Sequence, residues 1–202
     1  MMQSASTNGG MQMAQWISKA AAGCLIAASA APAEAQAPNG ALQAKQQAAM
    51  KALAFLDGEW AGPAEAHERT GTFKMTQTER VGTLLDGTVR LVEGRAFDGK
   101  GKTLFNAFAV ISYEVPRSRY VITSYASGYT TTTELKVKAD GFEWEVPAGP
   151  GAKMQFSAVV KNGTWTEVGD YVGSDGAKKR TFQMAVKRSG HSKWPAGTLV
   201  PR

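Results

Sequence analysis

The amino-acid sequence predicts an all-β protein, an antiparallel up-and-down β-barrel of about ten strands with one N-terminal capping helix. Apolar and polar residues alternate through most of the chain after Gly58, as in Phe142-Glu143-Trp144-Glu145-Val146, so each segment has one buried and one solvated face. Asp-Gly and Asn-Gly pairs, which accept the positive φ of tight hairpins, recur between these segments. Because the connections are short, consecutive strands must pair antiparallel, and closure into a barrel removes the two exposed edges.

The first segment, residues 1–35, has the features of a secretory signal peptide. Lys19 precedes a short apolar run over 20–31, and Ala33-Glu34-Ala35 supplies the small residues that a signal peptidase reads. We expect cleavage after Ala35 and a periplasmic or secreted protein; a short buried helix, or lipidation at Cys24, is the alternative. Cys24 is the only cysteine, so removal of this segment leaves a mature chain without disulfides or thiolate sites.

A linker and a helix are expected over residues 36–57. Apolar residues recur at helical spacing over 41–56, with lysine and glutamine between them, and Gly58 ends the helix. This helix would cap an open end of the barrel.

The barrel domain is predicted to span residues 58–188. The expected strands cover 58–67, 72–84, 88–97, 102–114, 120–126, 130–138, 141–146, 152–161, 164–172 and 179–188. A barrel of this size holds side chains or one small ligand, and a two-sheet sandwich is the alternative architecture. Residues 189–202 are expected to form a flexible basic tail, whose last four residues match the remnant of a cleavable expression tag.

The net charge of +6 is concentrated at the C-terminal end of the chain. Seven Lys and Arg residues and no acidic residue lie between Lys178 and Arg202, which is typical of a solvated end. Aromatic residues do not alternate with these charges as they do in nucleic-acid platforms, so no nucleic-acid partner is expected. No apolar run reaches the roughly 18 residues of a membrane-spanning helix.

The stretch Gly58-Glu59-Trp60-Ala61-Gly62 resembles the opening strand of nitrobindin-like and lipocalin-like barrels, which reads G-x-W-x-G-x-G. Here Ala64 replaces the last glycine. Residues 84–94 and 181–188 resemble a group of uncharacterised bacterial proteins with this barrel. The resemblance covers about residues 53–188 and implies the fold rather than a function.

Nitrobindin-type barrels bind haem through a histidine late in the chain. This sequence has only His67 and His191, so the late ligand is missing unless His191 serves, and no cofactor is expected. His67 follows the first strand beside acidic residues and is interpreted as a solvated histidine, with a proton carrier or metal ligand as the alternative. A metal site is not expected from two histidines and no mature cysteine.

No catalytic motif is present. The sequence contains neither a G-x-S-x-G elbow nor a glycine-rich phosphate loop, and the shared face of Glu143 and Glu145 is expected to be solubilising. A ligand site inside the barrel is the preferred hypothesis. The candidate ligand-binding residues are Trp60, Glu93, Arg95, Phe108, Tyr125, Trp144, Phe156, Trp165 and Phe182. The aromatic members would line the cavity or simply fill the core, with Phe105 as the alternative to Phe108 for the inward position. Glu93 and Arg95 would anchor a polar head group.

We therefore predict an exported lipocalin-like barrel that binds a small hydrophobic or amphipathic ligand. The alternatives are a structural or stress-related envelope protein with a filled core, a haem-binding barrel, and an enzyme that acts on a lipid-like substrate. A cavity of roughly 300 Å³ or more would favour binding, and a packed interior would favour the structural role. An enzyme would require Glu93, Arg95 or His67 to converge inside the cavity with perturbed proton affinity.

Overall fold

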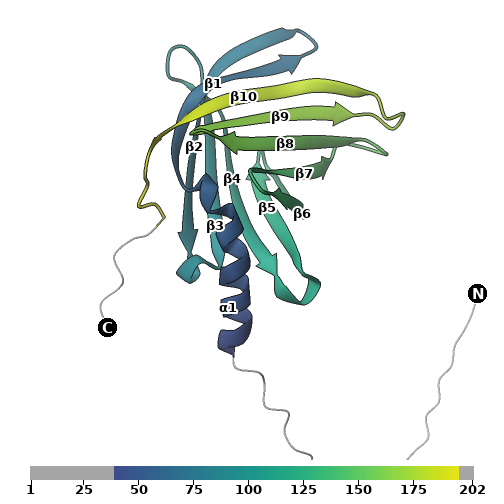
Figure 1. Cartoon of the computed structure of the whole chain (residues 1–202). Coiled ribbons are helices and arrows are strands. Elements are labelled where there is room, and N and C mark those ends of the chain that lie inside the picture. The colour runs from purple at the N-terminus through teal and green to yellow at the C-terminus, as the bar shows by residue number, and fades with distance from the viewer. Residues whose placement is uncertain (1–38, 196–202) are drawn as a thin grey trace, which may run out of the picture. The chain divides into compact units, whose positions relative to one another are not determined.

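The structure, a computed structural model, describes residues 39–195 (Figure 1). The predicted signal peptide lies outside these residues. The elements in chain order are α1 (Asn39–Met50), η1 (Lys51–Leu56), β1 (Gly58–Glu68), β2 (Gly71–Leu84), η2 (Leu85–Gly87), β3 (Val89–Phe97), β4 (Thr103–Glu114), η3 (Val115–Arg117), β5 (Arg119–Ala126), β6 (Tyr129–Lys138), β7 (Gly141–Pro147), β8 (Lys153–Lys161), β9 (Thr164–Val172) and β10 (Lys178–Gly190). Elements labelled η are short 3₁₀ helices.

The ten strands form one closed antiparallel barrel in which each strand pairs with its neighbours in sequence and β10 returns to β1. The predicted fold class is confirmed, and the expected strand boundaries differ from the observed ones by at most two residues. The turns follow the predicted chemistry. Asn162 and Gly163 both have positive φ between β8 and β9, as do Ser127 and Gly128 between β5 and β6.

The helical segment over 39–56 differs from the single helix that the sequence predicts. It is α-helical to Met50 and then tightens into the 3₁₀ helix η1. Leu53 and Leu56 are three residues apart and both fully buried. A 3₁₀ helix places residues i and i+3 on one face, which is why the tighter winding directs both leucines into the barrel.

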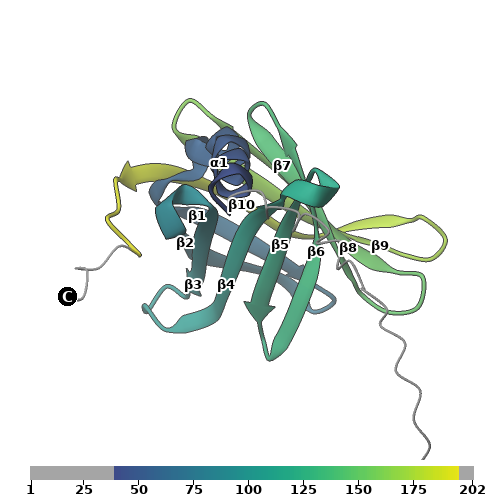
Figure 2. The same ribbon diagram turned by 90° about the horizontal axis from the view of Figure 1, so that it is seen from below.

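The helical segment lies at the barrel end where η2 joins β2 to β3 and η3 joins β4 to β5 (Figures 1 and 2). Its buried leucines pack into one hydrophobic core with residues from strands around the barrel. These include Trp60, Ile111, Leu135, Phe142, Trp165 and Val186. This end of the barrel is therefore sealed by a packed plug. The opposite end has no such cover within the described residues.

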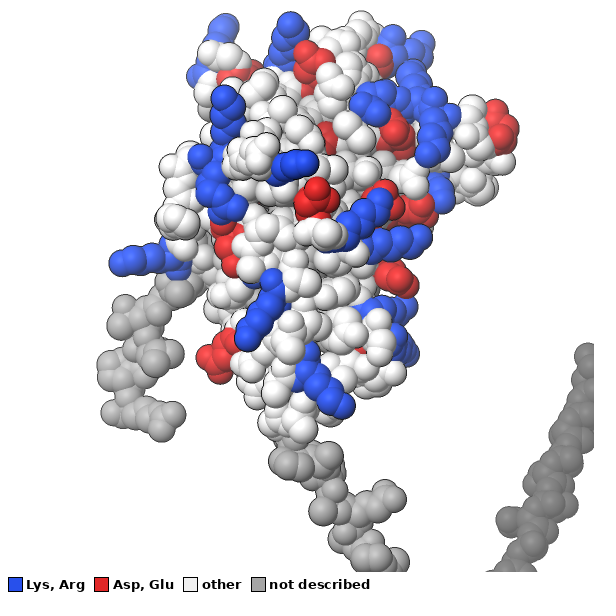
Figure 3. Space-filling model, in the orientation of Figure 1, with Lys and Arg blue, Asp and Glu red and all other residues white. Residues whose placement is uncertain are grey.

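The outer surface carries charges of both signs that are intermixed on the face shown in Figure 3. Several pair across strands, among them Arg180 with Asp170 at 2.5 Å and Lys153 with Glu145 at 2.8 Å. Glu143 pairs likewise with Lys138. The outward, solubilising placement predicted for Glu143 and Glu145 agrees with these contacts. No helix in the described part of the chain is both long and apolar enough to cross a membrane.

Candidate functional site

Two inward-facing arginines of the barrel wall bind the helical segment over 39–56, which is called the plug. Arg90 of β3 is almost completely buried and forms a bidentate ion pair with Asp57, at 2.6 and 2.8 Å. It also donates to the backbone carbonyl of Met50 at 2.8 Å. Arg188 of β10 donates to the carbonyls of Asp57 and Phe55. Both guanidinium groups are thus occupied by the helical segment, although both face the interior.

Trp60 and Trp165 form the floor below this plug. The indole N–H of Trp60 donates to the carbonyl of Leu56 at 2.9 Å, and Arg188 lies over its ring at 4.1 Å. The rings of Trp60 and Trp165 meet edge to face with centroids 5.8 Å apart. Both residues point inward as predicted, but they are 1% and 3% exposed. They are therefore packed core residues in this structure and leave no surface for a ligand.

The wall beyond the floor is lined by large aromatic side chains that are only half-buried. Phe182, Gly169, Phe156 and Trp144 follow one another across β10, β9, β8 and β7 in the ladder of paired residues. Trp144 stacks on Phe156 with centroids 4.3 Å apart and ring planes 15° apart. Glycine is required at position 169 because a Cβ there would lie 2.9 Å from the Phe156 ring. The result is a continuous aromatic wall on the inner face.

The rim of the uncovered end carries further inward-facing aromatic residues. By their strand register they are Phe73, Phe105, Tyr129 and Tyr171. They are exposed to 48%, 42%, 77% and 38%, whereas residues on the same inner face at the plug are nearly inaccessible. The inner face is therefore packed at one end and exposed at the other, and this exposed end with its aromatic residues is called the mouth.

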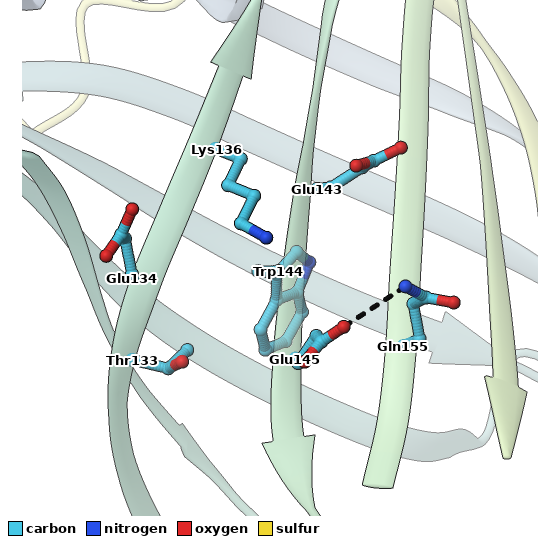
Figure 4. Close-up of a pocket in the computed structure, with 7 residues that line it drawn as sticks. All are labelled: Thr133, Glu134, Lys136, Glu143, Trp144, Glu145 and Gln155. Carbon is cyan, nitrogen blue, oxygen red and sulfur yellow. Dashed lines mark hydrogen bonds between the residues drawn. The ribbon is translucent and has the colours of Figure 1, made fainter. Parts of the chain in front are cut away.

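A side opening adjoins this mouth between β6 and β7. Their pairing ends at Leu135 and Trp144, although β6 begins at Tyr129 and β7 runs to Pro147. The unpaired stretch frames a hollow of about 120 Å³, shown in Figure 4, whose lining includes Thr133, Trp144, Glu145 and Gln155. Gln155 donates to Glu145 at 3.1 Å across its edge. The hollow is smaller than a typical ligand pocket of about 300–1,000 Å³, so it is an opening in the wall rather than a site by itself.

A polar layer lies between the aromatic wall and the floor. Gln77 and Glu79 of β2 and Glu167 of β9 face inward and are 4%, 9% and 9% exposed. Gln77 donates through Nε2 to Oε1 of Glu79 at 2.7 Å. The carbonyl oxygen of Gln77 and the indole N–H of Trp165 are buried without a hydrogen-bond partner. Two carboxyl groups and an unpaired amide oxygen therefore lie buried on the inner face of the barrel.

The neighbouring strands leave room for this layer. Gly94 faces Glu79 across the β2–β3 ladder, and a Cβ on Gly94 would lie 2.9 Å from both carboxyl oxygens of Glu79. On β1, which separates β2 from β10, the inward positions are taken by Gly62 and Ala64. Small residues at these positions allow the carboxyl groups to occupy the middle of the barrel.

Burial changes the proton affinity of both carboxyl groups. It raises the pKa of Glu79 to about 8, an effect that the hydrogen bond from Gln77 opposes and the charge of Glu167 reinforces. Burial also raises the pKa of Glu167 to about 7, with the nearby indole N–H of Trp165 acting in the opposite direction. At neutral pH these groups hold protons that ordinary carboxyl groups have lost. They can donate or accept hydrogen bonds, or ionise when a cation approaches.

Gln77, Glu79 and Glu167 are not among the residues predicted from the sequence. The alternation that predicts an inward Trp165 applies equally to Glu167, two residues further along the same strand. On β2, Glu79 is an even number of positions from Met75 and Val81 and therefore lies on the same face of the strand. Alternation therefore predicts an inward side chain at both glutamates. The residue type predicts the opposite, because an acidic residue in a strand is more often solvated.

The expected inward placement of Glu93 and Arg95 is wrong. Gly94 and Ala96 take the inward positions of β3, so Glu93 and Arg95 lie on the outer face. Glu93 lies between Arg80 at 2.5 Å and Arg95 at 2.6 Å. Partial burial acts to raise its pKa, but the hydrogen bonds from Arg95 and Arg80 outweigh this and lower it. An anchor for a head group inside the barrel is therefore not supplied by these two residues.

Of the two alternatives Phe105 and Phe108, it is Phe105 that faces inward, and the inward placement of Phe108 and Tyr125 is wrong. β4 carries apolar residues on both faces, and its inward set is Phe105, Ala107, Ala109 and Ile111. Phe108 and Tyr125 face each other on the outer wall, with centroids 6.2 Å apart. Trp194 packs against Phe108 edge to face and against the guanidinium of Arg80 at 4.6 Å. Trp194 thus contacts the outer wall.

Neither histidine faces the interior. His67 lies on the outer parity of β1 and is 3.0 Å from the hydroxyl of Thr72, and His191 is exposed beyond the end of β10. These residues do not fit a haem that lies inside the barrel, and with Glu93 and Arg95 they do not converge there. In the described part of the chain, no group of three or more His, Cys, Asp or Glu side chains is placed to hold a metal ion.

A second hollow, of about 600 Å³, lies outside the barrel. It runs between α1 and the β4–η3 turn, with Leu42, Gln46, Tyr113 and Pro116 in its lining. Its volume is in the range of ligand pockets. It lacks the buried polar groups of the interior, so the mouth is the stronger candidate site.

Comparison with known proteins supports the fold and goes no further. No protein-family model matches the chain, and no curated protein matches it. Among solved structures, the crystal structure of Rv2717c from M. tuberculosis is similar with a TM-score of 0.54 and 14% sequence identity. The match covers 70% of this chain and 97% of that one. At this level of identity, the two chains share a barrel architecture.

Proposed function

We propose that the barrel binds a small hydrophobic or amphipathic molecule through its uncovered end. The observation that carries this proposal is the contrast in exposure along one continuous inner face. Large aromatic residues that face inward are nearly inaccessible at the plug and 38–77% exposed at the mouth. A structural barrel with a filled core would have no reason to leave such side chains exposed on its inner face.

The energetics favour an apolar occupant of limited size. Covering an exposed aromatic side chain contributes about 1.5–3 kcal/mol when its burial is complete. Several rim and wall residues covered together supply enough to offset the loss of ligand freedom on binding. Because the polar layer lies beyond the aromatic wall, a molecule with an apolar body and a polar end fits better than a pure hydrocarbon.

A titration with 1-decanol tests the proposal with matched aromatic variants. We expect Trp144→Ala to weaken binding about tenfold, since it removes one stacked aromatic contact of about 1.4 kcal/mol. Tyr171→Ala, at the exposed rim, weakens binding in the same direction without disturbing the core. Tyr125→Ala, an exposed tyrosine on the outer wall, serves as the control and leaves the affinity unchanged. Isothermal titration calorimetry gives the three affinities.

Native mass spectrometry of the protein purified from its own host then identifies the natural occupant. A co-purifying small molecule that Tyr171→Ala loses and Tyr125→Ala retains supports the mouth as the site. Equal affinity of all variants for 1-decanol would place binding elsewhere, for example in the groove beside α1, where Leu42→Ala would then have the effect. If no molecule co-purifies and 1-decanol does not bind, the protein is a structural barrel and the proposed binding function is wrong.

We propose in addition that the protein is exported to the periplasm or beyond. The cation, short apolar run and small residues before Ala35 support this proposal. N-terminal sequencing of the protein recovered from its host is expected to begin at Gln36. An intact first segment on the cytoplasmic protein would contradict export.

A further inference from the structure

We infer that the polar end of the ligand is a primary amine, held as an ammonium group by Glu79 and Glu167 with the amide oxygen of Gln77. This inference rests on the proposed function, because it assigns the chemistry of the same interior. It concerns three inward-facing side chains on β2 and β9 that no hydrogen-bond donor in the described structure satisfies fully.

The polar layer holds a buried acceptor that has no donor within the described residues. Gln77 uses its N–H to contact Glu79 and leaves its carbonyl oxygen buried and unpaired, at a residue that is 4% exposed. The indole N–H of Trp165 is also buried without a partner, and the protons that Glu79 and Glu167 hold at neutral pH are released when a cation binds. A buried acceptor without a partner costs about 1–3 kcal/mol, so the site is incomplete without a donor from outside. An ammonium group supplies three donors at one point.

Within residues 39–195, no cation forms an ion pair with either of these carboxyl groups. Arg90 and Arg188 also face inward, but Asp57 and the backbone carbonyls of the helical segment occupy both of them. The other close charges on Glu79 are carboxylates, Glu167 and Glu93. A positively charged ligand would therefore be the counter-ion that the interior lacks, while a ligand carboxylate would face two acidic groups.

The proposal requires that a ligand reach the carboxyl groups from the exposed end of the inner face. Each of the two glutamates retains 9% of its surface, and they lie between the sealed floor and the half-buried aromatic wall. A straight alkyl chain that lies against Phe156 and Phe182 would place its end group at this depth. The aromatic faces of the wall also favour a cation that passes them.

The test compares decylamine, 1-decanol and decanoate, each below its critical micelle concentration. We expect decylamine to bind at least tenfold more tightly than 1-decanol, and decanoate to bind most weakly. In the double variant Glu79→Gln with Glu167→Gln, decylamine should lose its advantage while 1-decanol keeps or gains affinity. Glutamine has nearly the size of glutamate, so the barrel should stay folded. Glu93→Gln, an outer-wall carboxylate, is the matched control and should preserve the preference for the amine.

The outcomes separate the two proposals. Tight binding of 1-decanol with no preference for decylamine would overturn the amine assignment and leave the proposed function standing. A preference for decylamine that survives in the double variant would also overturn the amine assignment, because residues other than Glu79 and Glu167 would then recognise the ammonium group. If none of the three molecules binds, both the amine assignment and the proposed binding function fail.

Discussion

The buried carboxyl groups of Glu79 and Glu167 set the residue-scale behaviour of this barrel. Their pKa values of about 8 and 7 mean that the native state keeps protons that the unfolded chain releases near its ordinary value of 4.5. The free energy of unfolding must therefore fall as the pH rises from about 4.5 to about 8. Below this window both states are protonated, and the stability associated with these groups is fully present.

Replacing Glu79 with glutamine should remove most of this pH dependence. At pH 5 we expect Glu79→Gln to have nearly the wild-type stability, because glutamine resembles the protonated carboxyl. At pH 9 the variant should be more stable by a few kcal/mol, which corresponds to roughly 10 °C in melting temperature. Thermal unfolding followed by circular dichroism across this range provides the measurement.

The control residue is Glu93, whose pKa Arg95 and Arg80 lower on the outer wall. A lowered pKa contributes stability above the unfolded value of 4.5 that is lost as the pH falls, so Glu93→Gln should lower the melting temperature at neutral pH and have less effect in acid. If Glu79→Gln showed this same sign, the interior placement of Glu79 would be wrong.

At the scale of elements, the helical plug depends on a few polar contacts around its apolar residues. Arg90 connects the plug to the wall through Asp57 and the carbonyl of Met50, and Tyr120 donates to the carbonyl of Ala49 at 2.8 Å. These bonds satisfy carbonyl groups at the end of α1 that the helix itself leaves free. The plug is thus held at its C-terminal end, next to the floor.

Replacing Arg90 with methionine should loosen the plug without opening the barrel wall. Methionine keeps the apolar length but leaves Asp57 and the Met50 carbonyl without their donor, at a cost of about 2–4 kcal/mol. Hydrogen exchange should show faster exchange of the amides in 39–56 than in the strands. Arg95→Met, on the exposed outer face, should change stability by less than about 0.5 kcal/mol. Equal protection of the plug in both variants would contradict this role of Arg90.

The strands were predictable from the sequence because alternation and turn chemistry act locally. Phe142-Glu143-Trp144-Glu145-Val146 has one apolar face, and its parity is unambiguous. In β3 and β4 the same rule fails, since Val92, Glu93 and Gly94, or Ala107 and Phe108, offer no clear contrast between faces. There the register is set by the neighbouring strands, which bring Glu79 opposite Gly94. The alternation of residues within one strand therefore cannot predict which of its faces points inward.

At the scale of the whole molecule, closure of the sheet creates both an inside and two different ends. The sequence predicts the closed barrel and the cap, which the structure confirms. The polar layer could not be predicted in the same way, because Glu79 and Glu167 come together only after β1 and β10 close the barrel between them. Their juxtaposition is a property of the closed wall. The mouth follows from the same closure, since only one end receives the plug.

The methionine residues allow the site to be located directly. Met75, Met154 and Met184 face the barrel interior, whereas Met50 is the last residue of α1 and is buried at the sealed end. Labelling the methionine methyl groups with carbon-13 and adding decylamine therefore reports on both ends at once by nuclear magnetic resonance. We predict chemical-shift changes and ligand contacts at Met75 and Met154, with Met50 unchanged. Changes confined to Met50, or none at the interior methionines under saturating ligand, would contradict binding through the mouth.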